Sequence, residues 1–209
     1  VEKDSLTMVA LDGFRMAVSR EYAENMESRK IVIDARIINE IYKILAEEEE
    51  IEDIMLIIDE KKAGFLFGGT RIVSKLLEGA FIKYKDIIPK EYKCRLTVNR
   101  AELLDSVERA SLMAREGRNN LIKLSIEKDK IIITSRSEEG NVREEVFIKK
   151  EGENMEIGFN AKYISDVLKA VEDEEVAMEF NTAVSPCMIK PIEEEKYEYL
   201  ILPVRLSSN

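Results

Sequence analysis

The stretch IVIDARIINEIYK at residues 31–43 recurs 126 positions later as IGFNAKYISDVLK at residues 157–169, and both copies run on, without a gap, into acidic residues. Most positions of the two stretches keep the same class of side chain. Self-similarity of this kind indicates one supersecondary unit used more than once, with each copy supplying part of a shared architecture. We therefore expect function to belong to an assembly of such units rather than to one catalytic pocket.

Each copy predicts a strand followed by a helix. In the first copy, the β-branched run Ile31–Ile33 precedes Asp34, which is a plausible N-cap. The apolar residues that follow recur at helical spacing and form one stripe, which comprises Ile37, Ile38, Ile41, Ile44 and Leu45. A weaker third copy begins at Asn99, which together with Glu102 has the spacing of a capping box. Its predicted stripe comprises Leu103, Leu104, Val107, Ala110 and Ala114.

Between the helices, short apolar runs separated by turn residues predict antiparallel strands. Asp12-Gly13 is a strong turn signal between two strands in residues 6–19. Gly68-Gly69-Thr70 is typical of a β-turn, because no strand-to-helix transition or adjacent lysine marks it as a phosphate loop. Further strands are expected at 54–58, 65–67, 71–76, 121–126, 131–135, 142–148, 176–180, 184–189 and 197–204. The fold class is α+β, with repeated strand-helix-three-strand units that form antiparallel sheets and carry their helices on one face.

The segment from Gly79 to Lys93 breaks this pattern with mixed charge and with Pro89, the only proline in the first 180 residues. We place a domain boundary there, which divides the chain into residues 1–89 and 90–209. The second domain then reads as strand, helix and three strands, twice over. The first shows the unit only once.

Composition excludes several classes of protein. The chain has 209 residues, 45% of them hydrophobic, which is enough for a sizeable core, and its formal net charge of -10 argues against a uniformly basic nucleic-acid coat. A locally basic face is still compatible with this charge. Cys94 and Cys187 lie far apart, so neither a disulfide framework nor a zinc site is expected. No apolar stretch is long enough for a membrane span and no signal peptide is recognisable, so a cytoplasmic protein is expected.

A search for catalytic residues finds few candidates. The sequence contains no histidine, no phosphate-binding glycine motif and no Gly-x-Ser-x-Gly motif. The acidic run Glu47–Glu50 could supply the metal ligands of a metal-dependent hydrolase or nuclease, but consecutive residues at a helix end do not converge on one ion. We therefore expect no enzymatic activity, no cofactor and no metal.

The polar faces of the repeated helices carry matching cations. Arg36 and Lys43 correspond to Lys162 and Lys169, and a spacing of seven residues places each pair on one helix face. Cations on the third copy are Arg100 and Arg109. Lined up on one surface, these six side chains could contact a DNA backbone without reading its sequence. Alternatively, they form ordinary exposed ion pairs with the neighbouring carboxylates Glu40, Asp166 and Glu108.

Two segments do not repeat between the halves: residues 10–17, ALDGFRMA, and residues 199–206, YLILPVRL. Pro203 lacks a backbone donor and so predicts a sheet edge or a strand end, with its apolar neighbours partly open. The alternative is an ordinary buried final strand.

Together with the repeat, these segments resemble the bacterial DNA polymerase III β-subunit family, the processivity sliding clamps. The resemblance spans the whole chain. It rests on Leu11–Ala17, on Leu76–Phe81 followed by Tyr84 and Ile88-Pro89, on Gly158–Tyr163 and on Leu202–Leu206. Members of the family have three domains of one topology, and two subunits form a ring around DNA with twelve helices lining the hole. The resemblance thus implies a DNA-clamp fold.

Against the family pattern this chain is short. It lacks a counterpart to the first domain and to the opening strand and helix of the second, so we expect a fragment that cannot close a ring alone. The family's interface joins the third domain of one subunit to the first domain of another. A homodimer is therefore expected only of the full-length protein.

The resemblance also implies a hydrophobic cleft that receives short linear motifs of client proteins. One wall would comprise Gly13, Phe14, Arg15 and Met16, together with Ile82 and Ile87. The other would comprise Asn160, Tyr163, Val184, Pro186, Leu200, Leu202, Pro203, Val204, Arg205 and Leu206. Phe14 replaces a common histidine, Ile82 a common proline and Pro186 a small polar residue, and these departures could alter peptide preference. Ser207–Asn209 extend past the usual terminal leucine and either crowd the cleft or are disordered.

The expected function is therefore that of a non-catalytic sliding clamp, which encircles duplex DNA and tethers replicative polymerase. Expected partners are duplex DNA, the DNA polymerase III catalytic subunit, the clamp loader and other clamp-motif proteins, with no membrane. The alternative is a β-rich peptide-binding scaffold that makes no DNA contact.

Overall fold

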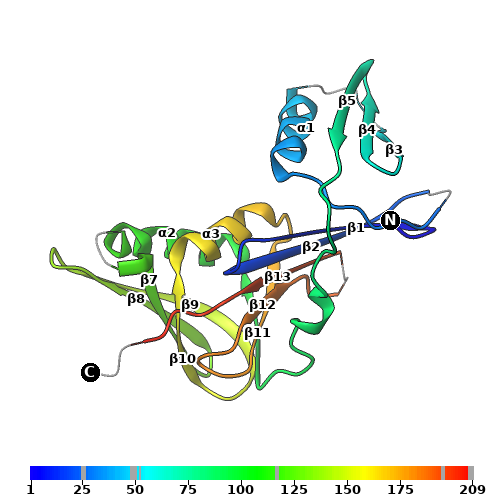
Figure 1. Ribbon diagram of the computed structural model, residues 1–209. Helices are drawn as coiled ribbons and strands as arrows, with labels where there is room; N and C mark the ends of the chain where they lie inside the picture. Colours follow the sequence, from blue (N-terminus) through cyan, green and yellow to red (C-terminus); the bar gives the residue numbers. More distant parts are fainter. Residues whose placement is uncertain (25–26, 48–50, 52, 116–117, 194–195, 207–209) are drawn as a thin grey trace. The chain divides into compact units, whose positions relative to one another are not determined.

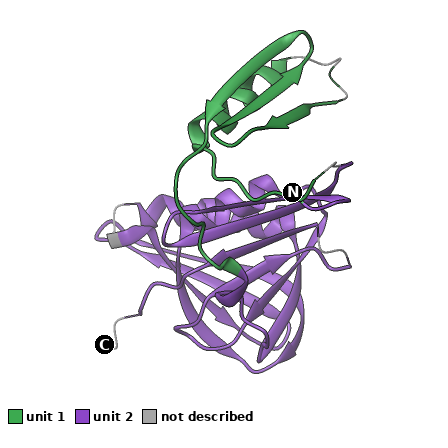
Figure 2. Ribbon diagram, turned by 45° about the vertical axis from the view of Figure 1, so that its right-hand side comes forward, with its two compact units in different colours: residues 1, 26–84 green, residues 2–25, 85–209 purple. Residues whose placement is uncertain are grey.

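The computed structural model describes residues 1–209 except 25–26, 48–50, 52, 116–117, 194–195 and 207–209 (Figure 1). The chain divides into two compact units (Figure 2). Unit 1 comprises Met26–Tyr84 together with Val1, and unit 2 comprises Glu2–Asn25 and Lys85–Asn209. The first strands of the chain thus belong to the same unit as its C-terminal half.

Among its described residues, unit 1 has one helix packed against a three-stranded antiparallel sheet. Its elements are α1 (Ala35–Glu47), β3 (Met55–Ile58), β4 (Lys62–Phe67) and β5 (Thr70–Lys75), with β4 in the centre of the sheet. Ile41 of α1 packs with Ala63, Phe65 and Phe67 of β4 to form the core. The predicted helix stripe is confirmed, because its remaining members pack against this core.

The ends of these elements follow local chemistry. The side chain of Asp34 accepts a hydrogen bond from the backbone N–H of Arg36 at 2.9 Å, as an N-cap does. Gly68 and Gly69 have φ values of 50° and 78°, the backbone that a tight hairpin between β4 and β5 requires. The predicted β-turn is therefore confirmed. Ile31–Ile33 lie outside the strands, so the strand expected there is wrong in this copy.

In the described part of unit 2 there are two helices and a ten-stranded sheet in which all neighbouring strands are antiparallel. The elements are β1 (Ser5–Leu11), β2 (Arg15–Tyr22), β6 (Cys94–Asn99), α2 (Arg100–Ala114), β7 (Leu121–Ile126), β8 (Lys130–Arg136), β9 (Asn141–Gly152), β10 (Met155–Asn160), α3 (Ala161–Ala170), β11 (Glu175–Phe180), β12 (Cys187–Lys190) and β13 (Tyr197–Ile201). The strand order is β1-β2-β13-β12-β11-β6-β9-β8-β7-β10. Short 3-10 turns occur at Tyr84–Asp86 and Arg118–Asn120. The predicted order of strand, helix and three strands, twice over, is confirmed for this half.

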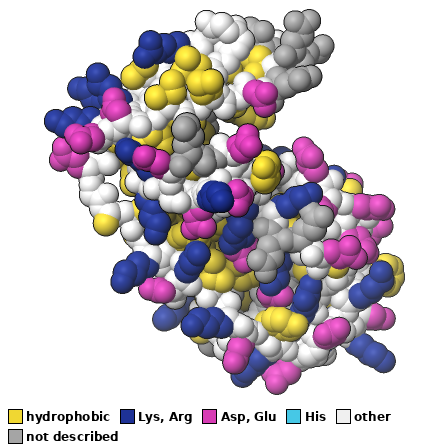
Figure 3. Space-filling model, turned by 90° about the vertical axis from the view of Figure 1, so that its right-hand side faces the viewer, with side chains coloured by type: hydrophobic (Ala, Val, Ile, Leu, Met, Phe, Trp, Pro, Cys, Tyr) yellow, Lys and Arg dark blue, Asp and Glu magenta, His cyan; other side chains and the backbone are white. Residues whose placement is uncertain are grey.

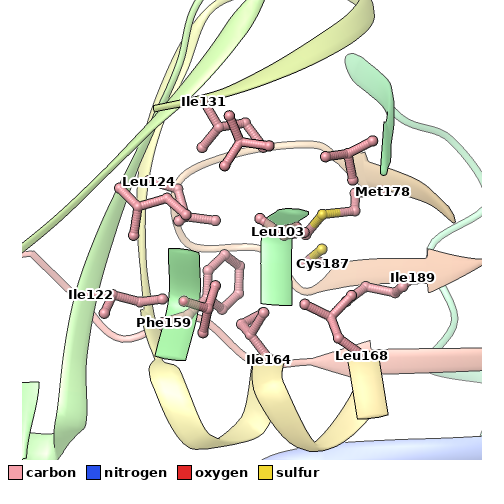
Figure 4. Close-up of a cluster of buried hydrophobic side chains, with 14 of the residues drawn as sticks. Leu103, Ile122, Leu124, Ile131, Phe159, Ile164, Leu168, Met178, Cys187 and Ile189 are labelled. Carbon is pink, nitrogen blue, oxygen red and sulfur yellow. The ribbon is translucent and has the colours of Figure 1, made fainter. Parts of the chain in front are cut away.

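The core of unit 2 lies between its helices and its sheet. Leu103 of α2 and Ile164 and Leu168 of α3 point toward Phe159 and Met178 of the strands (Figure 4). All five side chains are fully buried. Ala110 of α2 and Ala161 of α3 are also fully buried members of this core. The core explains why the stripe predicted from Leu103 to Ala114 folds as a helix.

Two strands of unit 2 are shorter than expected. β12 begins at Cys187 rather than at residue 184, because the backbone N–H of Ser185 donates to Thr182 O at 3.2 Å in a turn and Pro186 has no N–H to donate. β13 ends at Ile201, two residues before Pro203. The predicted strand end at Pro203 is thus confirmed. Among the described residues, no helix has the length and apolar character needed to span a membrane.

Candidate functional site

The β1–β2 hairpin presents two side chains through the chemistry of its turn. The carboxylate of Asp12 accepts hydrogen bonds from the backbone N–H groups of Phe14 and Arg15, each at 3.1 Å. Gly13 between them has a φ of 86°, which glycine adopts at little cost. Asp12 and Gly13 therefore fix the turn so that Phe14 and Arg15 project from it.

The guanidinium group of Arg15 connects this turn to helix α3. Its Nε donates to Asp12 Oδ2 at 2.8 Å and its Nη1 donates to Asp166 Oδ2 at 2.6 Å. Asp166 also accepts from Lys162 Nζ at 2.9 Å, one helical turn away. Arg15 is thereby held between two carboxylates, in a geometry that its planar fork of donors favours.

This network keeps all three groups ionised. Burial alone would raise the pKa of Asp12 and of Asp166, but hydrogen bonds from Arg15 outweigh burial and hold both pKa values below the usual range. Burial alone would likewise lower the pKa of Arg15, yet the hydrogen bonds to Asp166 and Asp12 raise it. The charge of Arg15 is neutralised within the protein, so this side chain orients its neighbours rather than offering a free cation.

An aromatic pair lies beside the guanidinium. The rings of Phe14 and Tyr163 are stacked with centroids 6.1 Å apart and an interplanar angle of 29°. The Arg15 guanidinium carbon lies 4.6 Å from the centroid of the Tyr163 ring, within cation–π range. Phe14 is 59% exposed, so one face of the pair is accessible to a ligand.

The C-terminal segment runs beside the same cluster. The backbone N–H of Leu202 donates to Phe14 O at 2.8 Å, and that of Val204 donates to Gly158 O at 2.8 Å. At Gly158, a Cβ atom would lie only 2.6 Å from Val204 O and 2.8 Å from a Leu206 methyl carbon. A glycine is therefore required for this close approach, which brings residues 202–206 across β10.

Beneath Phe14 and Leu202, apolar side chains cover the face of the sheet that looks away from the core. Met16 of β2, Leu200 of β13 and Met188 of β12 stand in register across three strands and are at most 5% exposed. Ile201, next to Leu200, is fully buried and belongs to the core. Since successive strand residues point to opposite faces, β13 is covered on both faces here.

A shallow hollow in unit 2 lies next to this apolar layer. Met188 lines it together with Pro186, Pro89 and Tyr92. Pro186 is one of the predicted site residues, and the hollow extends the apolar surface toward the β11–β12 loop. The same loop carries Val184, which is 66% exposed.

The structure thus brings most of the predicted peptide-site residues together. The cluster comprises Gly13, Phe14, Arg15, Met16, Tyr163, Leu200, Leu202, Pro203, Val204, Arg205 and Leu206. Asn160 lies beside it, but its side chain is used as the N-cap of α3, where it accepts from the backbone N–H of Lys162 at 2.9 Å. Ile82 belongs to unit 1 and Ile87 to unit 2, and both are about half exposed.

Sequence reasoning missed four residues that build the site. Asp12 was read only as a turn residue and Asp166 only as a partner for nearby lysines, yet both hold Arg15. Gly158 stands where the first copy has Val32, and this loss of a side chain is the signal in the sequence that could have indicated a close backbone contact. Met188 carries no signal that separates it from an ordinary strand residue.

The six cations predicted to face DNA are held in local interactions. Four helix pairs are within hydrogen-bond distance: Arg36–Asp34, Lys43–Glu40, Lys162–Asp166 and Lys169–Glu108. Arg109 reaches Glu144 of β9 at 2.7 Å. The expected pairs with Glu40, Asp166 and Glu108 are therefore confirmed. All five pairs are at least partly exposed, so exchange of a carboxylate for a phosphate would cost little.

Arg100 has a different role from the other five cations. Its guanidinium donates to the backbone oxygens of Leu168 at 3.2 Å and Asp173 at 3.0 Å, near the C-terminal end of α3. Carbonyl groups at a helix end lack helical partners, and a cation there is favoured by the helix dipole. Arg100 thus ties α2 to the end of α3.

The groups that could hold a metal or act as nucleophiles give no second site. No cluster of three or more His, Cys, Asp or Glu side chains suited to a metal occurs in the part of the chain that the structure describes. Of the acidic run Glu47–Glu50, only the first residue lies within the described residues. Cys94 and Cys187 are buried free thiols, and burial raises the pKa of both.

Comparison with known proteins gives consistent matches along the chain. A curated protein of Staphylococcus epidermidis, named "Beta sliding clamp", is 34% identical over 208 residues, which are 98% of this chain and 55% of that protein. The solved "DNA polymerase sliding clamp" of Bacillus subtilis is 35% identical with a TM-score of 0.93 over 99% of this chain and 55% of that one. The solved DNA polymerase III β subunit of Thermotoga maritima is 34% identical, with a TM-score of 0.91, over 99% of this chain and 56% of that one. The chain therefore spans about half the length of the relatives it matches.

Two family models divide the chain between them. The model for the central domain of the DNA polymerase III beta subunit matches residues 1–83, and the model for its C-terminal domain matches residues 85–205. The strand-helix-three-strand units described above agree with the fold of these relatives. The chain therefore belongs to the DNA polymerase III β-subunit family of sliding clamps.

Proposed function

We propose that the chain carries the client-binding part of a non-catalytic DNA sliding clamp, which tethers a replicative polymerase to duplex DNA. Within the intact protein, two subunits would close into a ring, and the clamp loader and other clamp-motif proteins would be further partners. Family membership supports this assignment. The observation that carries the client-binding role is the cluster around Phe14, Tyr163 and Leu202.

The cluster suits an extended peptide with apolar anchors. Leu202 and Phe14 are exposed above a buried floor, and Tyr163 offers a hydroxyl beside an aromatic surface. Arg15 is already paired with Asp12 and Asp166, so recognition would depend on apolar contact and on shape rather than on a free charge. In such interfaces a few buried contacts account for most of the binding free energy.

Peptide binding is tested with the 209-residue chain and a fluorescent peptide that copies the clamp-binding motif of a polymerase III catalytic subunit. We expect Leu202→Asp and Tyr163→Ala each to weaken binding at least about tenfold, because each removes a contact of hot-spot type. Leu112→Asp is the matched control, since Leu112 is 57% exposed on α2. An unchanged affinity after Leu202→Asp would refute the site assignment.

The DNA part of the proposal concerns topology rather than tight contact. We propose that Arg36, Lys43, Arg109, Lys162 and Lys169 exchange their carboxylate partners for phosphates, while Arg100 keeps its structural role. With net charge -10, the chain would bind DNA only weakly and so could slide. The intact protein from its native source should stay on circular DNA and leave it after linearisation. Retention on neither DNA would instead favour a peptide-binding scaffold without DNA contact.

A further inference from the structure

The three-stranded sheet of unit 1 has one face on its core and one face in solvent. The core face carries the buried side chains of Ala63, Phe65 and Phe67. Alternation along the strands places eight residues on the other face, which we call the outward face. They are Met55 and Ile57 of β3, Lys62, Gly64 and Leu66 of β4, and Arg71, Val73 and Lys75 of β5.

The centre of the outward face is apolar and open. Met55, Ile57 and Val73 are 62%, 50% and 51% exposed, far more than strand residues of a closed core. Gly64 stands between Ile57 and Val73 in the register. A Cβ atom there would meet only ordinary contacts, the nearest being Ile57 Cβ at 3.9 Å, so the missing side chain leaves a shallow depression.

The border of the outward face is cationic. Lys62, Arg71 and Lys75 are exposed, none of the eight positions is acidic, and none of the three cations forms a salt bridge among the described residues. The chain as a whole is acidic, with 42 acidic and 32 basic residues. A positive face is therefore a local departure from the charge of the whole chain.

Two of these cations oppose each other directly. Lys62 pairs with Lys75 across β4 and β5, and like charges at opposing positions destabilise a sheet. The carboxylate of Asp59 interacts electrostatically with Lys62. It already accepts hydrogen bonds from the backbone N–H groups of Lys61 and Lys62, at 2.7 and 2.6 Å. An anionic ligand would relieve the repulsion between the two lysines.

We propose that the outward face binds an acidic amphipathic helix of a partner protein. Figure 3 shows hydrophobic side chains gathered on unit 1 with Lys and Arg side chains beside them. The three strands are about 10 Å across, which matches the diameter of about 10–12 Å of one helix with its side chains. The apolar side of the helix would cover Met55, Ile57 and Val73, and its carboxylates would reach Lys62, Arg71 and Lys75.

A second copy of this chain fits the face less well. Pairing two such faces would bring Lys62, Arg71 and Lys75 of both copies together without any carboxylate from either face. Backbone pairing with another chain would use the outer edges of β3 and β5, because β4 is hydrogen-bonded on both sides, and it would leave the outward face itself uncovered. Charge complementarity thus favours an acidic partner whose side chains contact the face.

The probe is a synthetic amphipathic helix of about four turns, with leucine on one side and glutamate elsewhere, and its twin with lysine in place of glutamate. In a fluorescence titration with the 209-residue chain, the glutamate peptide should bind at least about tenfold more tightly than its twin at low salt. Equal binding of the two peptides would overturn the proposal.

Variants locate the binding. We expect two double variants each to weaken binding of the glutamate peptide at least about fivefold. They are Ile57→Ser/Val73→Ser and Arg71→Glu/Lys75→Glu. Lys128→Glu/Arg136→Glu is the matched charge control, because both residues are exposed in unit 2. Leu202→Asp should leave this binding unchanged, so the test is independent of the proposed client site.

Two outcomes would refute the assignment. One is a loss of glutamate-peptide binding in Leu202→Asp but not in the sheet variants, which would place the peptide at the client site. The other is concentration-dependent self-association in analytical ultracentrifugation that Ile57→Ser/Val73→Ser abolishes. That result would make the outward face a contact between copies of the chain.

Discussion

The two strong copies of the repeat build the same frame and use it differently. In both, a side chain caps the helix at 2.9 Å, from Asp34 in one and Asn160 in the other. In both, the backbone oxygen two residues earlier accepts a 2.8 Å hydrogen bond from a later segment: Val32 O from Leu77 N and Gly158 O from Val204 N. The frame is thus a property of the repeated sequence.

The difference lies in what meets the helix from outside. Ile37 packs against the core of unit 1, whereas its counterpart Tyr163 contacts Phe14 and Arg15. Glu40 pairs with Lys43 of its own helix, whereas its counterpart Asp166 holds Arg15 from β2. A repeated scaffold therefore became a candidate binding site because a non-repeated turn docks on one copy.

The largest effect on stability is expected when Gly158 of the second copy is replaced by valine, the residue at the matching position of the first copy. In Gly158→Val, the new Cβ would lie 2.6 Å from a backbone oxygen, so residues 202–206 must shift. We expect a loss of about 1–3 kcal/mol of unfolding free energy in urea, with faster hydrogen exchange of the Val204 amide. The reverse change Val32→Gly should cost only about 0.5–1 kcal/mol, through chain entropy. Unchanged protection of Val204 would show that the close approach is not required.

The next largest effect is expected from removing the guanidinium group of Arg15, which connects β2 to α3. Arg15→Met leaves Asp12 and Asp166 without their shared cation, and should cost about 1 kcal/mol because these groups are partly exposed. The pKa values of both carboxyl groups are below the usual range when folded, so their stabilisation is present above about pH 4 and is lost as the pH falls further. The acid-induced fall in stability should therefore be shallower in Arg15→Met, as measured by urea titrations between pH 3 and 7. An equal fall in both proteins would contradict the assigned network.

The caps offer a smaller and cleaner contrast. Asn160→Ala should cost about 1 kcal/mol at any pH, because an amide cap does not titrate. Hydrogen bonds from the side chain and backbone of Arg36 lower the pKa of Asp34 to about 2. The cap of α1 is then fully stabilising above the unfolded pKa of about 3.9 and is lost as the pH falls through about 2. NMR titration of the Asp34 carboxyl group checks this, and a midpoint near 4 would contradict it.

The smallest effects concern the surface pairs. Lys43→Met breaks a pair within one helix, and Lys169→Met breaks one that joins α3 to α2. Each should cost less than about 1 kcal/mol, and less still in high salt. Thermal melts at two salt concentrations measure this. A larger cost that salt does not reduce would show that these lysines are structural and not free to exchange partners.

The repeat, the caps and the turn glycines were predictable from sequence because each depends on local chemistry. Asn99 and Asp34 accept backbone hydrogen bonds as expected, and Gly68-Gly69 forms the expected turn. Pro203 likewise marked the end of a strand. Patterns of this kind report on a few neighbouring residues and need no knowledge of the tertiary fold.

The candidate site was less accessible to such reasoning, because its contacts join residues far apart in sequence. Arg15 pairs with Asp166, and Phe14 stacks on Tyr163, and neither pairing follows from spacing. The family resemblance supplied most members of the cluster, but not the role of Asp12 or the reason for Gly158. The start of β12 was wrongly predicted at residue 184 rather than at Cys187, since it depends on a turn from Thr182 to Ser185.

The placement of β1 and β2 has a consequence for the order in which the chain can fold. Ser19 of β2 pairs with Tyr197 of β13, and Met26–Tyr84 of unit 1 lie between them in sequence. On a ribosome, β2 is made well before its partner strand β13, because residues 23–196 are synthesised between them. Met16 and Val18 are buried in the folded protein, so they stay exposed until β13 has been synthesised. Such a long-range closure is slow, and until it occurs the edge of β2 is open to pairing with other chains.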